Sequence, residues 1–208
     1  MKQPAILFIQ SSRIKRYILA LIIVWTGIII ASLAWNLYII DATARNLARA
    51  EAQSNFNKDL LYRRWNAMQG GVYAPVSEFT PPNPYLEVPE REITTRSGRV
   101  LTLVNPAYML RQVHEFEQEQ EGSYGHITSL NPIRPENAPD PWEAEALKLF
   151  EQGIAETSSV EELNGQPVMR YMHVLLTEES CLKCHAAQGY KLGDVRGGIS
   201  ITFPMQPY

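Results

Sequence analysis

A run of 24 residues without a charged side chain, from Tyr17 to Ile40, constrains the fold of this chain more than any other feature. A helix rises about 1.5 Å per residue, so this run reaches roughly 36 Å and can cross a bilayer core of about 30 Å. Trp35 and Tyr38 lie near its end, where amphipathic rings favour the interface. A cleaved signal peptide with its cleavage site at Ser32–Ala34 is the alternative, but the apolar run continues past that site and exceeds the usual core of about 7–15 residues. The sequence therefore predicts an uncleaved, single-pass membrane anchor over residues 17–40.

Charge is distributed unevenly on the two sides of the apolar run. Residues 1–16 hold no acidic side chain and four basic ones, namely Lys2, Arg13, Lys15 and Arg16. All 22 acidic residues and the other 15 of the 19 basic residues follow from Asp41 onward. The positive-inside rule predicts that residues 1–16 are cytoplasmic and that residues 41–208 lie on the periplasmic side of the cytoplasmic (inner) membrane. The acidic outer part excludes nucleic acid as a partner, because nucleic acid is bound by a basic face.

A second helix-like pattern follows the apolar run directly. Residues 41–69 contain no Gly or Pro, and apolar residues recur every three to four positions, at Ala48, Ala52, Phe56, Leu60, Leu61, Trp65 and Met68. This spacing predicts a helix with one buried stripe that continues the membrane helix outward and ends at Gly70–Gly71. Five prolines between Pro75 and Pro89 then forbid regular structure for most of that stretch. We expect it to form an ordered wrap that buries four large side chains, those of Tyr73, Phe79, Tyr85 and Leu86.

The remaining sequence alternates strand and helix signals. Residues 106–118 and the segment after Asp140 predict helices; Asp140, Pro141 and Glu143 supply the start signals of the second. Strands are predicted over residues 99–105, 124–130, 160–163, 166–177 and 197–203. The pair Asn164–Gly165 predicts a tight hairpin between two of them. The sequence thus predicts an α+β fold: an N-terminal transmembrane helix continuing into a long helix, then a PAS-like domain with an antiparallel sheet.

The chemistry of the chain is concentrated in the segment CLKCH, which holds its only two cysteines, Cys181 and Cys184, and His185. A dithiol switch is typical of a thioredoxin-like βαβ context, which is not evident here. Zinc needs four ligands, and no second ligand pair is spaced among the other histidines. C-x-x-C-H is the attachment motif of c-type haem. Such haems are attached outside the cytoplasmic membrane, where residues 41–208 are predicted to lie. The motif predicts one covalently attached haem c with His185 as proximal ligand; a bare disulfide and a zinc site are the alternatives.

The sixth ligand of the predicted haem iron would separate electron transfer from ligand sensing. A distal thiolate is excluded, because the chain has no third cysteine. His114, His126 and His173 are candidates, each also interpretable as a surface or core histidine. Met68 is the favoured metal ligand, since it lies just before Gly70–Gly71, where backbone can approach a ligand closely, although it is also a natural core residue. An open or water-bound iron is the remaining alternative.

Several motifs in order resemble a bacterial family of c-type-haem, PAS-like sensor domains, which occurs alone and on histidine kinases, diguanylate cyclases and chemoreceptors. They are "RRWNAMQGGVYAPVSEFTPPNPYL", "LTLVNPAYMLRQVHE", "HITSLNPIRPENAPDPWEAEAL" and "TEESCLKCHAAQGYKLGDVRGGISI". The resemblance covers about residues 40–205. It implies a PAS-like fold, haem c on Cys181 and Cys184, and His185 as proximal ligand. Members often place a distal His, or in shorter members a Cys, near the end of the first helix. In the histidine type it directly precedes the GGVY stretch, where this sequence has Gln69.

Two functions follow as expectations, and neither makes the chain an enzyme. The first is a periplasmic haem sensor that responds to redox state or a small ligand and passes the signal to a partner protein. The alternative is a membrane-tethered electron carrier, an accessory subunit of a respiratory or photosynthetic complex. Sensors of the resembling family usually continue into a second membrane helix and an output domain, whereas this sequence ends at Tyr208, which favours the carrier or a separate signalling partner. A peroxidase is disfavoured, because the sequence places no distal His/Arg pair.

Overall fold

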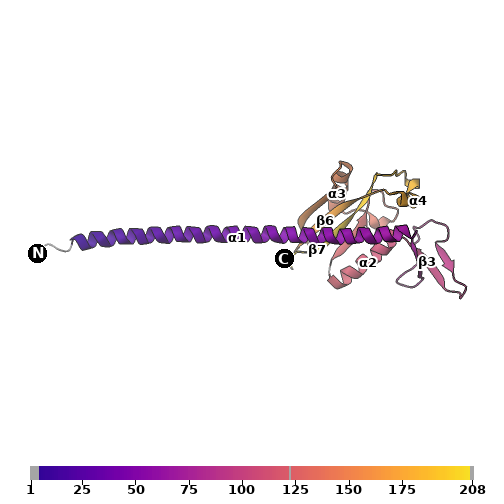
Figure 1. Cartoon of the computed structure of the whole chain (residues 1–208), viewed down its shortest axis with the longest axis horizontal. Helices are drawn as coiled ribbons and strands as arrows, with labels where there is room; N and C mark the ends of the chain where they lie inside the picture. Colours follow the sequence, from indigo (N-terminus) through magenta and orange to yellow (C-terminus); the bar gives the residue numbers. More distant parts are fainter. Residues whose placement is uncertain (1–4, 122, 207–208) are drawn as a thin grey trace. The chain divides into compact units, whose positions relative to one another are not determined.

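The computed structural model describes residues 5–121 and 123–206, and the chain divides into two compact units, Met1–Asn46 and Leu47–Tyr208. One helix, α1 (Ala5–Met68), contributes residues to both units (Figure 1). In the first unit every side chain of residues 17–40 is exposed, and the helix is long and apolar enough to cross a membrane. The prediction of one uninterrupted helix through residue 40 and beyond is confirmed. The boundaries predicted for the cytoplasmic, transmembrane and outer segments (1–16, 17–40 and 41–208) stay predictions.

The part of α1 in the second unit buries only half of the predicted apolar stripe. Ala48, Ala52 and Phe56 are buried in the core, as expected. After Phe56 the buried positions are polar, Asp59 and Asn66, whereas the predicted Leu60, Leu61, Trp65 and Met68 are exposed. The reason is angular: at about 100° per residue, Trp65 lies roughly half a turn around the helix from Phe56. The stripe prediction is therefore wrong for the last three turns of α1.

A small three-stranded antiparallel sheet follows α1, in the order β1 (Val72–Pro75), β3 (Val100–Val104), β2 (Glu92–Thr94). Gly70 and Gly71 end α1 with φ values of 75° and 98°, which side chains rarely adopt. The proline-rich stretch between β1 and β2 has no regular structure, as predicted. Side chains of the helix α2 (Pro106–Glu121) donate hydrogen bonds to its carbonyls at Phe79 and Pro81. Of the four large side chains that were expected to be buried, only Leu86 is. The expectation that the other three, Tyr73, Phe79 and Tyr85, are buried is wrong.

The main sheet has four antiparallel strands in the order β4-β7-β6-β5. Their bounds are β4 Tyr124–Thr128, β5 Glu156–Leu163, β6 Gln166–Leu176 and β7 Val195–Pro204. Asn164 and Gly165 join β5 to β6 with φ values of 54° and 77°, the positive values that a tight hairpin turn requires. The predicted strands and hairpin are confirmed, and β5 and β7 are longer than predicted.

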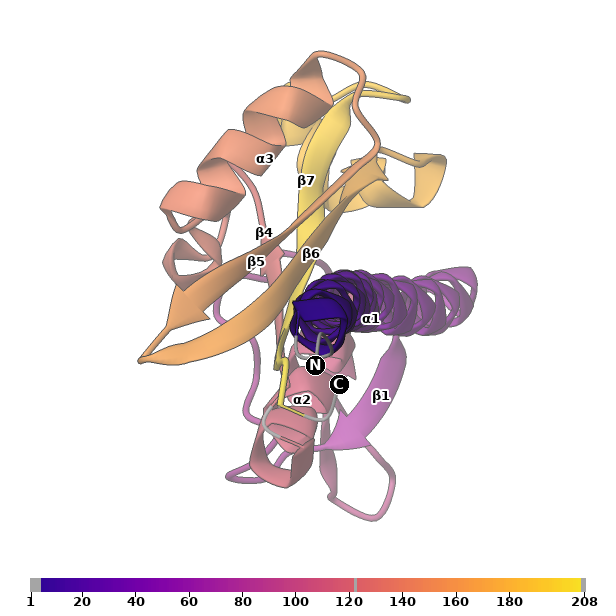
Figure 2. The ribbon, with the colours of Figure 1, turned by 90° about the vertical axis from the view of Figure 1, so that its left-hand side faces the viewer.

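Helices cover both faces of the main sheet (Figure 2). On one face, α1 and α2 (Pro106–Glu121) enclose a core that includes Phe56, Leu110, Tyr171 and Ile199. On the other, α3 (Pro141–Glu151) packs Leu147 and Phe150 against the sheet. The capping box predicted at the start of α3, between Asp140 and Glu143, is present. The fold is therefore α+β with a long N-terminal apolar helix and antiparallel sheets.

Candidate functional site

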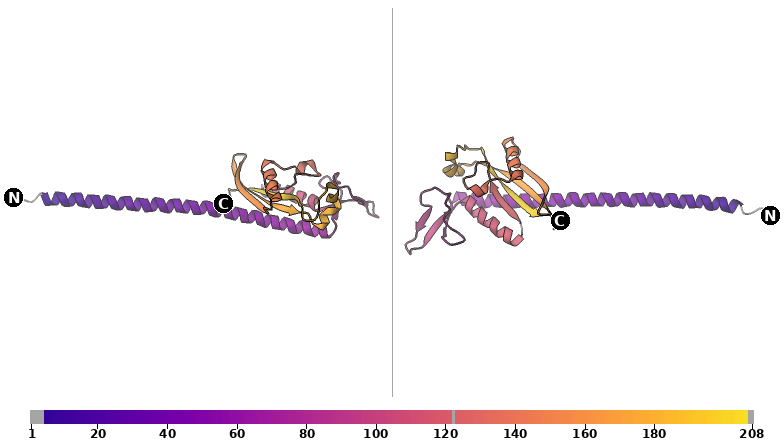
Figure 3. Two further views of the ribbon diagram at one scale, coloured as in Figure 1. Left: turned by 90° about the horizontal axis from the view of Figure 1, so that it is seen from above. Right: turned by 180° about the vertical axis from the view of Figure 1, so that it is seen from behind.

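The CLKCH segment belongs to the connection between β6 and β7, the two central strands of the main sheet. After β6 the chain forms three short helices in succession, η2 (Glu179–Cys181), α4 (Leu182–His185) and η3 (Ala186–Gln188), before it enters β7. This segment lies at the same end of the domain as the end of α1 (Figure 3). Both cysteines are free thiols and, like His185, half-buried; burial raises the pKa of the Cys184 thiol. Two thiols and an imidazole are thus presented by one compact segment at the edge of the domain.

The imidazole of His185 is held in one tautomer by a neighbouring amide. Its Nδ1 atom lies 2.7 Å from Oε1 of Gln188, and Nε2 of the same amide donates to the carbonyl of Asn131 at 3.0 Å. Because the amide nitrogen is occupied by Asn131, the amide oxygen faces the ring and accepts the Nδ1 proton. Burial lowers the pKa of His185, and the positive charge of Arg196 lowers it further. His185 is therefore a neutral imidazole that carries its lone pair on Nε2, the atom that can bind a metal.

Two arginines from distant parts of the chain converge on this segment. Arg196, on β7, places Nη2 3.3 Å from Nε2 of His185, donates from Nη1 to Oγ of Ser129 at 3.0 Å, and stacks over the ring of Tyr190 at 4.9 Å. Arg63 comes from α1, and its charge acts on both Cys181 and His185. Burial lowers the pKa of both guanidinium groups. Nη1 of Arg63 and Nε of Arg196 are buried, and neither has a hydrogen-bond partner among the described residues.

Two of the three histidines considered as distal ligands, His114 on α2 and His173 on β6, contact side chains of α1. His114 is buried and its Nε2 lies 2.8 Å from Oδ2 of Asp59. His173 stacks on Phe56 at 4.4 Å, and its Nδ1 donates to the carbonyl of Val174. Each of these rings thus has one nitrogen engaged within the protein. Their assignment as iron ligands stays a prediction.

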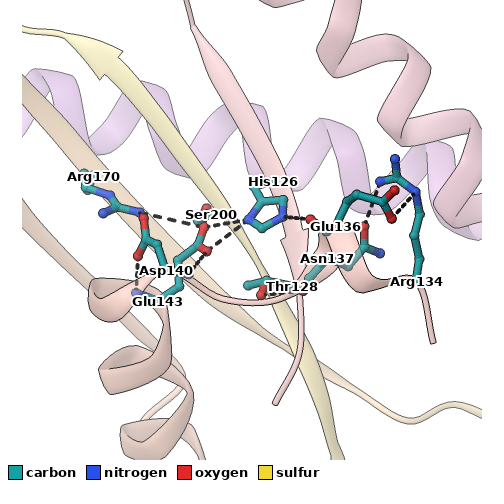
Figure 4. Close-up of polar contacts among 9 residues, drawn as sticks. All are labelled: His126, Thr128, Arg134, Glu136, Asn137, Asp140, Glu143, Arg170 and Ser200. Atoms are coloured by element: carbon teal, nitrogen blue, oxygen red, sulfur yellow. Dashed lines mark hydrogen bonds and ion pairs between the residues drawn. The ribbon is translucent and has the colours of Figure 1, made fainter. Parts of the chain in front are cut away.

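His126 belongs to a polar network on the α3 face of the main sheet (Figure 4). Its Nδ1 lies 3.0 Å from both carboxylate oxygens of Glu143, and its Nε2 donates to the carbonyl of Glu136 at 3.1 Å. Glu143 is 1% exposed and also accepts from Ser200. Burial lowers the pKa of His126, but the Glu143 hydrogen bond and charge outweigh it, so the pKa is raised. An imidazolium that donates from both nitrogens fastens the start of α3 to β4 and β7, which is a structural role.

Met68, the favoured distal ligand in the sequence, is the last residue of α1 and is 77% exposed. Its interpretation as a core residue is wrong. Five residues separate it from Arg63, which at about 100° per residue turns it roughly 140° away around the helix. Met68 and Arg63 therefore lie on different sides of α1, and it is the charge of Arg63 that acts on Cys181 and His185. Met68 as an iron ligand stays a prediction.

A cavity of about 250 Å³ lies between α2, β4 and η1 (Pro135–Asn137), and its charged lining includes Arg111, Arg134 and His126. No residue of the CLKCH segment lines it. Within the described part of the chain, no three His, Cys, Asp or Glu side chains cluster as a metal site. We place the candidate site at the CLKCH segment, because the nucleophilic and metal-binding side chains lie there together.

Three residues of this site escaped sequence analysis: Arg63, Gln188 and Arg196. Gln188 follows His185 by three positions, which is one helical turn, so the spacing offered a signal for it. Arg63 and Arg196 are 133 positions apart in the numbering and come together only through the packing of the domain, which single-sequence patterns do not carry.

Comparisons with known proteins give one family match and one structural match. The sequence model of the Tll0287-like family matches residues 41–204. The crystal structure of the cyanobacterial haem protein Tll0287 is similar to this chain with a TM-score of 0.49 and 14% sequence identity, and the match covers 74% of this chain and 93% of that one. No curated protein matches at a significant level. Since the family match spans most of the sequence, the chain belongs to the Tll0287-like family.

Proposed function

We propose that the protein is a membrane-anchored, periplasmic monohaem c-type protein that senses redox state or a small ligand. One observation carries the proposal: the bond from Nδ1 of His185 to Gln188 puts the lone pair of the ring on Nε2, in the same short segment as two free thiols. Thiols two residues apart are the pattern that joins the two vinyl groups of haem, and the adjacent imidazole is its axial ligand. Membership of the Tll0287-like family supports it, since Tll0287 itself is a haem protein.

The residues of the site fit such a group. Cys181 and Cys184 would hold it covalently, and His185 would bind the iron through Nε2. Gln188 orients the ring by accepting the Nδ1 proton, and this partnership makes an axial imidazole more basic. When bound, haem supplies one-electron chemistry and, where a coordination position is open, small-ligand binding.

The direct connection of the CLKCH segment to two strands of the main sheet supports a sensing role. η2, α4 and η3 connect β6 to β7, and β7 pairs with both β6 and β4. A shift of His185 therefore acts on the two central strands and, through Gln188, on Asn131 after β4. The exposed position of Met68 supports an open coordination site, which a ligand sensor needs. The domain has a PAS-like role in this proposal, with a separate signalling protein as partner and no catalytic activity of its own.

Electron transfer is the second candidate, and one observation favours it. The cysteines and His185 are only half-buried, so the attached group would lie near the surface, where a redox partner can reach it. In that case the chain is an accessory cytochrome of a membrane respiratory or photosynthetic complex. Both functions use the same anchor: the uncharged helix over residues 17–40, with basic residues before it.

Absorption spectra of the full-length protein in detergent, in both oxidation states and with and without CO, test the proposal. A sensor with an open position shows a c-type spectrum that CO changes rapidly in the ferrous state. A carrier shows a c-type spectrum that CO leaves unchanged. A preparation matured in a host with functional cytochrome c assembly that shows no haem absorption overturns the haem assignment itself.

A further inference from the structure

The two arginines beside the CLKCH segment are half-buried cations, and each has one buried nitrogen without a hydrogen-bond partner among the described residues. Arg196 contacts His185 and Ser129, and burial together with the positive charge of Arg196 lowers the pKa of Arg63. Ion pairs among the described residues involve other cations, and none includes Arg63 or Arg196. Burying a cation without a counter-charge is unfavourable, and two such cations side by side more so. Each of the two arginines therefore lacks a negatively charged partner in the described part of the chain.

The carboxylates of the chain do not supply these partners. The charges of Asp59 and Glu178 act favourably on Arg63. However, neither carboxylate forms an ion pair with Arg63 among the described residues: Asp59 bonds through Oδ2 to His114 and its Oδ1 has no partner, whereas Glu178 is exposed to solvent. Thus Nη1 of Arg63 and Nε of Arg196 point into the protein with no acceptor among the described residues. The missing component is an acceptor with negative charge that enters from outside the polypeptide.

Arg196 gains a free donor when His185 binds a metal. Its Nη2 now donates to the Nε2 lone pair of His185 at 3.3 Å. A nitrogen that has given this lone pair to iron no longer accepts a hydrogen bond. A metal on Nε2 therefore requires the guanidinium of Arg196 to move away from the lone pair, and this movement releases Nη2 as a donor. A guanidinium in this state is ready to bind a carboxylate through two parallel N–H donors.

We propose that Arg63 and Arg196 bind the two propionate carboxylates of the haem and thereby hold it at the CLKCH segment together with the covalent bonds. This inference rests on the proposed function, because it requires haem at His185. The charges match, since two carboxylates meet two guanidinium groups. Each arginine keeps its carboxylate ionised, and the pair together determines the charge beside the iron. A free anion bound at the same two arginines shares this chemistry, and the experiment below distinguishes the two sources.

The test compares Arg63→Gln and Arg196→Gln with Arg64→Gln, a matched control at the neighbouring exposed position of α1. Haem content is read from the intact mass of the polypeptide, and the midpoint potential is titrated from acid to neutral pH. Loss of a positive charge beside the iron favours the ferric state. At the wild-type midpoint potential we expect the ferrous-to-ferric ratio to fall about tenfold in each site variant and to stay unchanged in the control. A propionate without its arginine takes up a proton more easily, so the variants gain a pH dependence of the potential that the wild type lacks.

Each other outcome has a defined meaning. If the wild-type protein carries no haem, the proposed function fails, whereas haem-loaded variants with unchanged potential and pH dependence overturn the arginine assignment alone. If the wild-type potential depends on the concentration of acetate or phosphate and the variants lose this dependence, the arginines bind a free anion and the propionate assignment is wrong. Should a Gln variant fail to fold, Arg63→Lys and Arg196→Lys keep the cation. For these variants we expect the ferrous-to-ferric ratio to change by less than tenfold but by more than the error of the control. An unchanged ratio would contradict the proposal.

Discussion

The Nδ1 atom of His185 lies 2.7 Å from Oε1 of Gln188, and the same amide donates to the carbonyl of Asn131 at 3.0 Å. This chain of two hydrogen bonds links the proposed axial ligand to the loop that follows β4. Because the amide can accept at only one end, it fixes both the tautomer and the plane of the imidazole. The strength of this acceptor should therefore control how strongly His185 donates to iron.

Gln188 variants test this control. Gln188→Glu provides a charged acceptor, makes the imidazole more basic and should lower the midpoint potential; Gln188→Leu removes the acceptor and should raise it. We expect each change to alter the ferrous-to-ferric ratio by roughly tenfold at the wild-type midpoint. Potentiometric titration measures the ratio, and the iron–histidine stretching frequency should rise in the first variant and fall in the second. Gln152→Leu, at the exposed C-cap of α3, is the control. Equal shifts in both Gln188 variants would show that Gln188 has only a packing role.

The buried Glu143 should contribute to stability through His126. Glu143→Gln keeps the shape but leaves the doubly donating imidazolium without its counter-charge, so we expect a loss of about 2–3 kcal/mol in the free energy of unfolding. Urea denaturation near neutral pH measures it. Glu145→Gln, on the exposed face of the same helix, should change stability by less than about 0.5 kcal/mol. Similar losses in both variants would contradict the account of the network.

The same network predicts a pH dependence with a definite sign. The pKa of His126 is raised in the folded protein, so its contribution is fully present below the unfolded pKa of about 6.5 and is lost as the pH rises through the folded value. Unfolding free energies measured from pH 6 to pH 9 should therefore fall for the wild type. In His126→Gln this part of the decline should be missing. A decline of equal size in that variant would assign the pH dependence to another group.

Met68 separates the two proposed functions. Its exposed side chain favours an open coordination site, so we expect the ferrous protein to bind CO rapidly and Met68→Ala to leave the rate unchanged. Stopped-flow absorption measures the rate, with Leu61→Ala, another exposed position of α1, as the control. A weak near-infrared band of sulfur ligation in the ferric wild type, absent in Met68→Ala, would restore Met68 as a ligand and favour the electron carrier. A bis-histidine spectrum would direct the search to His114, His126 and His173.

The predicted membrane topology can be checked on cells. Residues 41–208 should be digested by a protease added from the periplasmic side, whereas residues 1–16 should be protected. A reporter that is active only in the periplasm should work when fused after Tyr208. Activity of a cytoplasm-specific reporter at that position would reverse the proposed orientation.

Sequence patterns predicted those parts of the fold that depend on local chemistry. The hairpin at Asn164–Gly165, the capping box of α3 and the end of α1 at Gly70 follow from turn and cap preferences, which act over a few residues. The exposure of Trp65 was missed, because a helix with apolar residues on two sides does not show which side meets the sheet. The arginine pair was missed because Arg63 and Arg196 are far apart in the sequence and come together only when the domain folds.

Covalent attachment of haem is the central claim, and acid–acetone extraction of the full-length protein tests it most directly. The account predicts that the haem of the wild type stays with the polypeptide and that the intact mass exceeds that of the chain by one haem. Cys181→Ala and Cys184→Ala should weaken or abolish this attachment, and His185→Ala should keep the mass but change the spectrum through loss of the axial ligand. Complete extraction of haem from the wild-type protein would contradict the account.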